Sequence, residues 1–143
     1  VNVMLGELNT VSHRLNGDRF DCILLLNILH LLPDPAFTLA SFARLLTPDG
    51  RIVIGSPNFS YLPYVCRRVC RDPRFVNLGS YENSGLHVTT RRVVRRWFDE
   101  CRLTTEKVVN VVPDRWRRLK AISGSATDFL FGRELIVVGR RVR

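Results

Sequence analysis

Apolar stretches alternate along this chain with short polar turns, and their lengths predict an α/β protein. Residues 1–8 and 20–27 are apolar runs of strand length, separated by a polar segment, 9–19, with a turn at 16–18. Near-continuous hydrophobicity, as in 20–27, is typical of a parallel strand that is covered on both faces. Further strands are predicted at 51–56, 104–112 and 134–142.

A helix is predicted between the strands at 20–27 and 51–56. Asp34 is a suitable N-cap, and Pro35 falls at the first helical position, where its missing N–H costs nothing. Pro48 and Gly50 end the helix. The apolar positions follow the spacing i, i+3, i+4 and i+7 of one helix face, at Leu39, Phe42, Ala43 and Leu46.

A second helix is predicted at 91–101, with Thr89 or Thr90 as its cap. One of its faces is apolar, formed by Val93, Val94, Trp97, Phe98 and Cys101. The other face carries arginines, and two i,i+4 ion pairs are expected on it, Arg95/Asp99 and Arg96/Glu100. This arginine run is therefore interpreted first as a solvated helix face.

The segment 57–88 is the longest irregular part of the chain. It is rich in proline, glycine and aromatic residues, and a short helix is expected near 64–71. Long segments of this kind inside a compact domain are usually functional, often as a lid or a substrate loop. Tyr61, Tyr64 and Tyr81 could line a pocket there, although aromatic residues in a long loop more often pack the loop down.

Residues 20–58 therefore form a strand–helix–strand unit with a polar residue at the exit of each strand. Asn27 ends the first strand and Asn58 follows the second. In open α/β sheets, ligands bind at the carboxyl ends of the strands. An Asn that ends an otherwise apolar strand has little packing reason to be there, which favours a functional role for Asn27.

The charge of the chain allows two interpretations. The net charge is +9, and every basic residue except Lys107 and Lys120 is arginine. Such a surplus can indicate an anionic partner such as nucleic acid. The arginines are dispersed and poorly interleaved with aromatic residues, so a bias toward arginine codons is the preferred interpretation, and nucleic acid is an unlikely partner.

Cysteine usage and hydropathy predict a soluble, cytoplasmic protein. The cysteines, Cys22, Cys66, Cys70 and Cys101, form no CxxC pair and have no His at ligand spacing, so no metal site is expected. The longest apolar run, 22–32, is too short to cross a bilayer. The first residue is Val1, inside an apolar run, so we expect a piece of a longer chain.

The ordered motifs resemble those of class I S-adenosylmethionine-dependent methyltransferases. The family shows a Phe-Asp-x-Ile strand, a Leu-Glu-His-Leu-x-Asp-Pro turn, a Leu-Leu-x-Pro-Gly-Gly helix end and a strand ending Ser-x-Pro-Asn. Segment 85–92, Gly-Leu-His-Val-Thr-Thr-Arg-Arg, is similar to the family's entry into its next helix. The matching segments are Phe20-Asp21-Cys22-Ile23, Leu29-His30-Leu31-Leu32-Pro33-Asp34-Pro35, Leu45-Leu46-Thr47-Pro48-Asp49-Gly50 and Ser56-Pro57-Asn58.

The chain departs from the family pattern at three places. His30 stands at the usual Glu position and Leu31 at the usual His, and Asp49 replaces the first Gly after the helix. The nine glycines contain no G-x-G, so the family's Gly-rich cofactor turn is absent. The chain therefore corresponds to the C-terminal two-thirds of the domain and starts at its third strand.

The resemblance implies a partial Rossmann-like sheet, mostly parallel with an antiparallel C-terminal strand and helices on both faces, in a single domain, 1–143. The family's strand order is 3-2-1-4-5-7-6. Strand 20–27 normally pairs with the family's first strand, so here its outer edge is unpaired. Exposed edges favour association. Self-association through this edge is expected, and residues 1–8 either pair with it or are poorly ordered.

The resemblance also implies site residues. Glu7 and Leu8 stand where the family contacts the adenine of S-adenosylmethionine, and Asn27 and Ile28 lie beside its methionine part; these are the candidate cofactor-binding residues. The candidate substrate-binding residues are Asn58 and Tyr81, and the candidate catalytic residues are His87 and His30, whereas His13 is expected to be solvated. A strand-end turn and a local hydrogen bond are the alternative roles for Glu7 and for the histidines.

The predicted function is S-adenosylmethionine-dependent methyl transfer to a small-molecule acceptor, as part of a longer chain. By itself the chain is expected to bind the cofactor poorly. The alternative is a non-catalytic, arginine-rich interaction module that binds an anionic partner such as nucleic acid, and it would show steeply salt-dependent binding.

Overall fold

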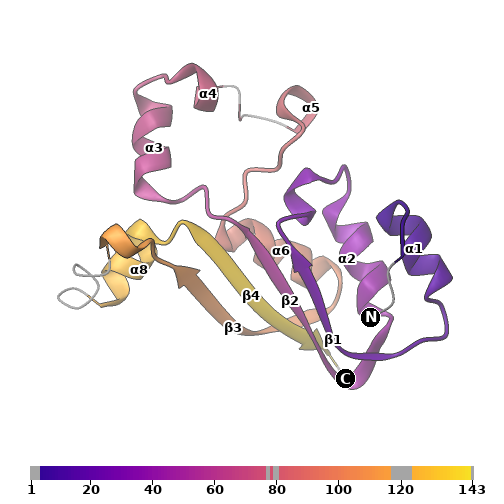
Figure 1. Cartoon of the computed structure of the whole chain (residues 1–143). Helices are drawn as coiled ribbons and strands as arrows, with labels where there is room; N and C mark the ends of the chain where they lie inside the picture. Colours follow the sequence, from indigo (N-terminus) through magenta and orange to yellow (C-terminus); the bar gives the residue numbers. More distant parts are fainter. Residues whose placement is uncertain (1–3, 77, 79–80, 117–123, 143) are drawn as a thin grey trace.

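The computed structural model describes residues 4–76, 78, 81–116 and 124–142 (Figure 1). A four-stranded mixed sheet forms its centre, in the order β1-β2-β4-β3. The strands are β1 (Phe20–Leu26), β2 (Leu46–Pro57), β3 (Leu103–Val111) and β4 (Glu134–Arg141). The predicted α/β class is confirmed.

The pairing of the strands follows the order expected for the family's last four strands. β1 runs parallel to β2, with Leu24 opposite Val53. β4 lies antiparallel to both of its neighbours, and Val53 is opposite Val138 on its β2 side. β1 is thus an edge strand of the described sheet, as the sequence predicted.

Two helices, α2 (Pro35–Ala43) and α6 (Arg91–Glu100), cover one face of this sheet, and α1 (Leu8–Arg14) packs beside α2 (Figure 1). The predicted apolar faces of α2 and α6 are buried against the sheet, that of α2 on β2 and that of α6 on β3 and β4. This burial is the main stabilising contribution to the fold. The core includes Leu25, Leu39, Phe42, Ile52, Ile54, Val94, Trp97, Phe98, Leu135 and Val137.

The predicted helix starts are confirmed at the level of single hydrogen bonds. Asp34 Oδ1 accepts from the backbone N–H of Phe37 at 2.8 Å. Thr90 Oγ1 accepts from the backbone N–H of Val93 at 3.3 Å. Each bond satisfies one of the N–H groups that the first turn of a helix leaves unpaired.

Two local predictions are wrong. α2 ends at Ala43, and Leu46 begins β2 because it pairs with Phe20, so this strand starts before the predicted residue 51. The expected Arg95/Asp99 pair is absent from the ion pairs of the described residues, where only the Arg96–Glu100 pair, at 3.7 Å, is formed on this helix. Arg95 instead lines a cavity beside β3.

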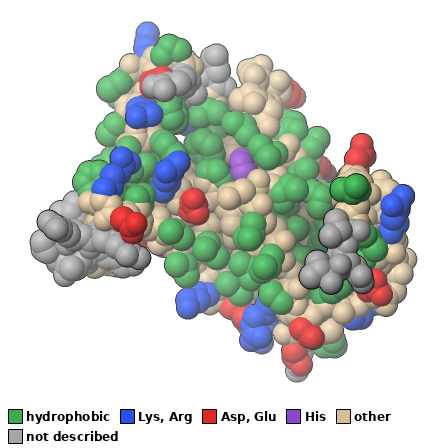
Figure 2. All heavy atoms as spheres, in the orientation of Figure 1, with side chains coloured by type: hydrophobic (Ala, Val, Ile, Leu, Met, Phe, Trp, Pro, Cys, Tyr) green, Lys and Arg blue, Asp and Glu red, His purple; other side chains and the backbone are tan. Residues whose placement is uncertain are grey.

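The other face of the sheet is apolar and has no described helix over it. On β1, Leu24 and Leu26 are 58% and 55% exposed, whereas Leu25 between them is buried. Val109 and Val111 of β3 are also exposed. Figure 2 shows hydrophobic side chains gathered over the face turned toward the viewer. Helices on both faces were expected, and in the described residues only one face is covered.

The strand predicted at residues 1–8 is not formed by its described part. Residues 4–7 are irregular, and α1 follows in the segment that was interpreted as a polar linker. Leu8 and Leu15, seven residues apart, pack against the core on one side of this helix. A strand at residues 4–8 would have to form hydrogen bonds with the outer edge of β1. No described strand pairs with β1 on that side. Residues 1–3 lie outside the described residues.

The long segment after β2 contains three short helices, α3 (Leu62–Val69), α4 (Pro73–Val76) and α5 (Tyr81–Ser84). They stand beyond the carboxyl ends of β1 and β2 (Figure 1). α3 corresponds to the short helix expected near 64–71. A 3₁₀ turn, η2 (Asp114–Trp116), and a helix, α8 (Ser125–Phe131), lie between β3 and β4. Among the helices that the structure describes, none has the length and apolar character to cross a membrane.

Candidate functional site

The carboxyl ends of β1 and β2 lie side by side and bring Asn27 next to the end of the second strand. The backbone N–H of Asn27 donates to the carbonyl of Gly55 at 2.8 Å, which continues the parallel ladder by one residue. Asn27 has a φ of 54°, in the left-handed region that side chains other than Asn and Asp rarely adopt. Its side chain is exposed at this edge, so its amide is accessible to a ligand.

A 3₁₀ turn, η1 (Leu29–Leu31), follows directly and carries His30 into the interior. His30 is 7% exposed, and its Nδ1 has no hydrogen-bond partner among the described residues. Burial, and to a smaller extent the nearby His87, lower the pKa of His30. The surroundings of this imidazole therefore disfavour its protonated form.

His87 and Tyr81 lie against this turn from the long segment after β2. The backbone N–H of His87 donates to the carbonyl of His30 at 2.8 Å. The side chain of His87 lies 3.0 Å from the carbonyl of Leu32 through Nε2, and a carbonyl can only accept, so Nε2 carries the proton. The lone pair of Nδ1 is then the basic position of this imidazole, and no hydrogen bond of the described residues uses it.

Tyr81 completes this arrangement. Its hydroxyl donates to the carbonyl of Leu31 at 3.2 Å, and its ring is stacked on His87. The edge of Trp97, in α6, approaches the other side of the His87 ring, with the centroids 5.8 Å apart. The structure therefore brings together His30, His87 and Tyr81, which are up to 57 residues apart in the sequence.

Asn58 has an internal role that the sequence did not reveal. It is 2% exposed, its Nδ2 donates to the carbonyl of Gly132 at 2.8 Å, and its Oδ1 accepts from the N–H of Ser60 at 3.1 Å. These bonds join the end of β2 to the turn before β4. Both polar atoms of the side chain are engaged in the described structure.

Glu7 and Leu8 lie at a helix start and not at the predicted strand end. Glu7 is the exposed residue before α1, and its carbonyl accepts from the N–H of Val11 at 2.9 Å. Leu8 packs against the core. Ile28, the remaining candidate for cofactor contact, is half-buried between Asn27 and η1.

Tyr61 is buried with its hydroxyl group hydrogen-bonded, an arrangement that the sequence did not predict. It is 1% exposed, and its hydroxyl accepts from the guanidinium of Arg115 at 2.5 Å and from the indole N–H of Trp116 at 3.3 Å. The residues are more than 50 positions apart, so no local pattern predicts this contact. Tyr64 packs edge-on against Tyr61, with the ring centroids 4.9 Å apart, so these aromatic residues pack the loop down.

The residues at this edge suit one wall of a cofactor site. The exposed amide of Asn27 can bind the amino and carboxylate groups of an amino acid, and half-buried Ile28 offers an apolar contact beside it. The glycine turn that would hold the opposite side is not in the sequence. Among the described residues, no group of three His, Cys, Asp or Glu side chains is placed to hold a metal ion.

The residues at this edge lie within the segment that matches a known protein family. Residues 2–54, which include α1, β1, η1, α2 and most of β2, match the model of the methyltransferase domain family. The comparison with curated proteins gave no match.

Solved structures share the fold at low identity. An S-adenosylmethionine-dependent methyltransferase from Archaeoglobus fulgidus matches with a TM-score of 0.65 and 14% identity, over 98% of this chain and 67% of that chain. The mitomycin 7-O-methyltransferase MmcR matches with a TM-score of 0.56 and 17% identity, over 94% of this chain and 39% of that chain. A methyltransferase from Mesorhizobium loti matches with a TM-score of 0.55 and 18% identity, over 87% and 62%.

The chain thus spans less than two thirds of the length of the last two structures. At these identities the likeness concerns the fold. The chain therefore resembles a class I S-adenosylmethionine-dependent methyltransferase, with a family match over residues 2–54 and the fold of the C-terminal part of that domain.

Proposed function

We propose that this chain takes part in methyl transfer from S-adenosylmethionine to a small-molecule acceptor, as the acceptor-side wall of a methyltransferase site. The observation that carries the proposal is the position of Asn27, His30, His87 and Tyr81 at the carboxyl ends of β1 and β2. The methyltransferase family match supports it, since the match covers the strand and turn that present Asn27 and His30.

Asn27 and Ile28 are the residues proposed to hold the methionine part of the cofactor. The left-handed backbone at Asn27 directs the chain away from the sheet, and its side-chain amide is exposed. Glu7 and Leu8 remain assigned to the adenine by resemblance alone. When bound, S-adenosylmethionine supplies an electrophilic methyl group on a positively charged sulfur.

His87 is proposed to receive the proton of the acceptor. If S-adenosylmethionine were bound, the acceptor would take the methyl group on its lone pair as the sulfur kept the electron pair of the broken bond, and Nδ1 of His87 would take up the proton that the acceptor loses. The bond from Nε2 to Leu32 and the stacking of Tyr81 hold the imidazole in one orientation. Holding the reacting groups in place is the main contribution an enzyme makes to such a displacement.

Nuclear magnetic resonance of the full 143-residue chain tests the cofactor wall. We expect weak binding of S-adenosylmethionine, with shifts centred on the backbone amides of Asn27 and Ile28. Asn27→Gly should abolish them, because glycine keeps the left-handed backbone and removes only the amide. Asn16→Gly, an exposed turn position, is the matched control and should leave them unchanged. Shifts that are absent at millimolar cofactor, or that survive in Asn27→Gly, would contradict the proposal.

A further inference from the structure

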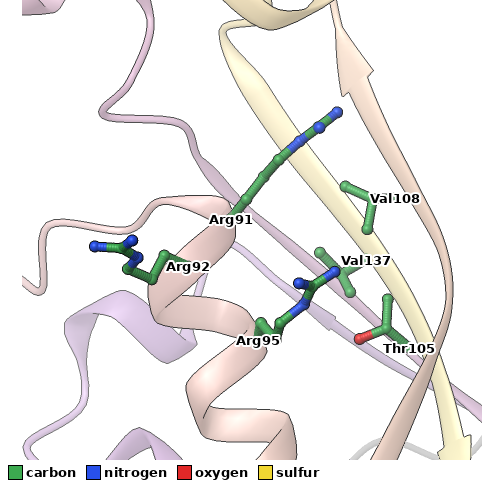
Figure 3. A pocket seen from close by; sticks show the side chains of 6 residues that line it. All are labelled: Arg91, Arg92, Arg95, Thr105, Val108 and Val137. Carbon is green, nitrogen blue, oxygen red and sulfur yellow. The ribbon is translucent and has the colours of Figure 1, made fainter.

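A cavity of about 430 Å³ lies between α6 and the outer strands of the sheet. Its size is that of a small-molecule site. In Figure 3, the side chains of Arg91 and Arg95 extend from the helix over the strands, whereas Arg92 turns to the other side of the helix. The lining residues are Arg91, Arg92, Arg95, Thr105, Val108 and Val137.

Arg91 and Arg95 both line this cavity. They are four residues apart on one helix, and like charges at this spacing destabilise a helix. Among the described residues, neither takes part in an ion pair, whereas Arg96, on the same helix, pairs with Glu100. Both guanidinium groups are exposed beside the cavity and are not neutralised by a carboxylate of the described residues, so an oxyanion bound there would gain charged hydrogen bonds from them.

The floor of the cavity is apolar. Val108 is half-buried and Val137 is 3% exposed, and the half-buried Thr105 is the polar residue contributed by the strands. A ligand that fits this lining has an anionic head for the arginines and an apolar body for the valines. Guanidinium groups bind the oxygens of phosphate and carboxylate in a bidentate manner, which gives this head its chemistry.

The cavity continues toward the carboxyl end of β2. An adjoining cavity of about 460 Å³ shares Arg91 and is also lined by Asn58 and Ser60. Thr90 caps the ten-residue α6 at the same point, so the partial positive charge of the helix N-terminus lies on the side of Arg91. The helix N-terminus therefore favours negative charge at this end of the cavity.

We infer that the cavity between α6 and β3 binds a small molecule that carries a phosphate or carboxylate group, held by Arg91 and Arg95, with its apolar part on Val108 and Val137. This site is independent of the proposed methyl transfer, since it uses none of Asn27, His30 or His87. A small molecule fits better than a nucleic acid strand because the described lining of this cavity holds no aromatic side chain on which bases could stack, and Phe129 is the aromatic residue in the described lining of the adjoining cavity.

Titration of the full chain with phenyl phosphate, benzoate and inorganic phosphate tests the site, with the side-chain Nε–H resonances of the arginines as the readout. We expect shifts at Arg91 and Arg95, and tighter binding of phenyl phosphate than of inorganic phosphate. The comparison of phenyl phosphate with benzoate shows which oxyanion the site prefers. Arg91→Gln and Arg95→Gln should each weaken binding about tenfold, because a hydrogen bond to a charged group is lost.

Arg96→Gln is the matched control, since it removes the same charge from the same helix outside the cavity. Its affinity should equal that of the unmodified chain. Without ligand, Arg95→Gln should also raise the melting temperature slightly, because it removes a like-charge pair. Equal losses in Arg96→Gln, or no shift at Arg91 and Arg95 with any of the three anions, would overturn the inference. So would tight, steeply salt-dependent binding of a single-stranded oligonucleotide without binding of phenyl phosphate.

Discussion

Tyr81 is stacked on His87, with the ring centroids 4.6 Å apart and the ring planes inclined by 19°. The hydroxyl of Tyr81 donates to Leu31 and Nε2 of His87 donates to Leu32, so both rings are also bonded to the turn after β1. The pair therefore joins the segment after β2 to the strand end that presents Asn27. This contact closes one side of the candidate site.

The stacked pair should hold the His87 backbone in place. Tyr81→Phe keeps the stacking and loses one partly exposed hydrogen bond, so we expect a loss of about 1 kcal/mol or less in the free energy of unfolding. Tyr81→Ala also loses the ring contact and should cost about 1–2 kcal/mol more. Urea unfolding measures both. Hydrogen exchange of the His87 amide, which donates to His30, should accelerate in Tyr81→Ala, and unchanged protection would show that the ring pair does not position His87.

The pKa of His30 predicts a pH dependence of stability. Burial and His87 lower this pKa, so just below pH 6.5 the unfolded chain takes up a proton that the folded chain does not. The free energy of unfolding should therefore be constant above this pH and fall as the pH drops toward the lowered pKa. In His30→Gln this part of the dependence should disappear. Urea unfolding between pH 5.5 and pH 7.5 measures it.

His13 provides the control for this experiment, since it is an exposed histidine on α1. His13→Gln should retain the slope of the unmodified chain. A steeper loss of stability in His30→Gln than in His13→Gln on acidification would contradict the assigned direction of the pKa shift.

The part of the fold that the sequence predicts well is the part determined by local patterns. Asp34 and Thr90 cap helices because their side chains reach the first-turn N–H groups, and the alternation of strands and helices follows from apolar spacing. The helix of α1 was missed because residues 9–19 are mostly polar and only Leu8, Val11 and Leu15 follow a helical spacing. The strand expected before it depended on pairing partners, which no local pattern supplies.

The sequence named several residues of the candidate site and none of its contacts. His30, His87 and Tyr81 lie together in the structure, and their roles in the site stay predictions. The bonds of Asn58 to Gly132 and of Tyr61 to Arg115 join residues 74 and 54 positions apart, so only the folded chain reveals them. The ion pair of Arg95 with Asp99 was predicted from their spacing alone. In the structure Arg95 lines the cavity beside β3.

Cys101 should be the least reactive thiol of the protein. Burial, and then the charges of Glu100 and Asp34, raise its pKa to about 11, and its thiol donates to the carbonyl of Ala36 at 3.1 Å. Its thiolate fraction at pH 8 is therefore about 100-fold below that of an ordinary thiol. In a reaction with Ellman's reagent, the exposed Cys22, Cys66 and Cys70 should react first and Cys101 much later.

Two comparisons check this assignment. The exposed thiols should react in a fast phase, and Cys101→Ala should leave the amplitude of this phase unchanged. When the unmodified chain is unfolded in guanidinium, all four thiols should react in the fast phase. A smaller fast phase in Cys101→Ala would show that this thiol is accessible and ionised in the folded protein.

The edge of β1 should make the chain associate with a second copy of itself. The outer backbone groups of β1 pair with no described strand, and Leu24 and Leu26 beside them are more than half exposed. An identical β1 strand, antiparallel across a two-fold axis, supplies matching donors and acceptors. We expect the mass from light scattering to rise with concentration. Added salt should strengthen association, because it screens the repulsion between two chains of charge +9.

Leu24→Lys tests this interface, since a lysine on an edge strand disfavours pairing with another edge. The variant should remain monomeric at concentrations at which the unmodified chain associates. Val69→Lys is the control, because Val69 is 76% exposed on α3, outside the sheet, and the same charge there should not change the mass. If the unmodified chain is monomeric at every concentration, association through the β1 edge is excluded. Equal effects of the two substitutions would mean that general charge repulsion, and not the β1 edge, controls association.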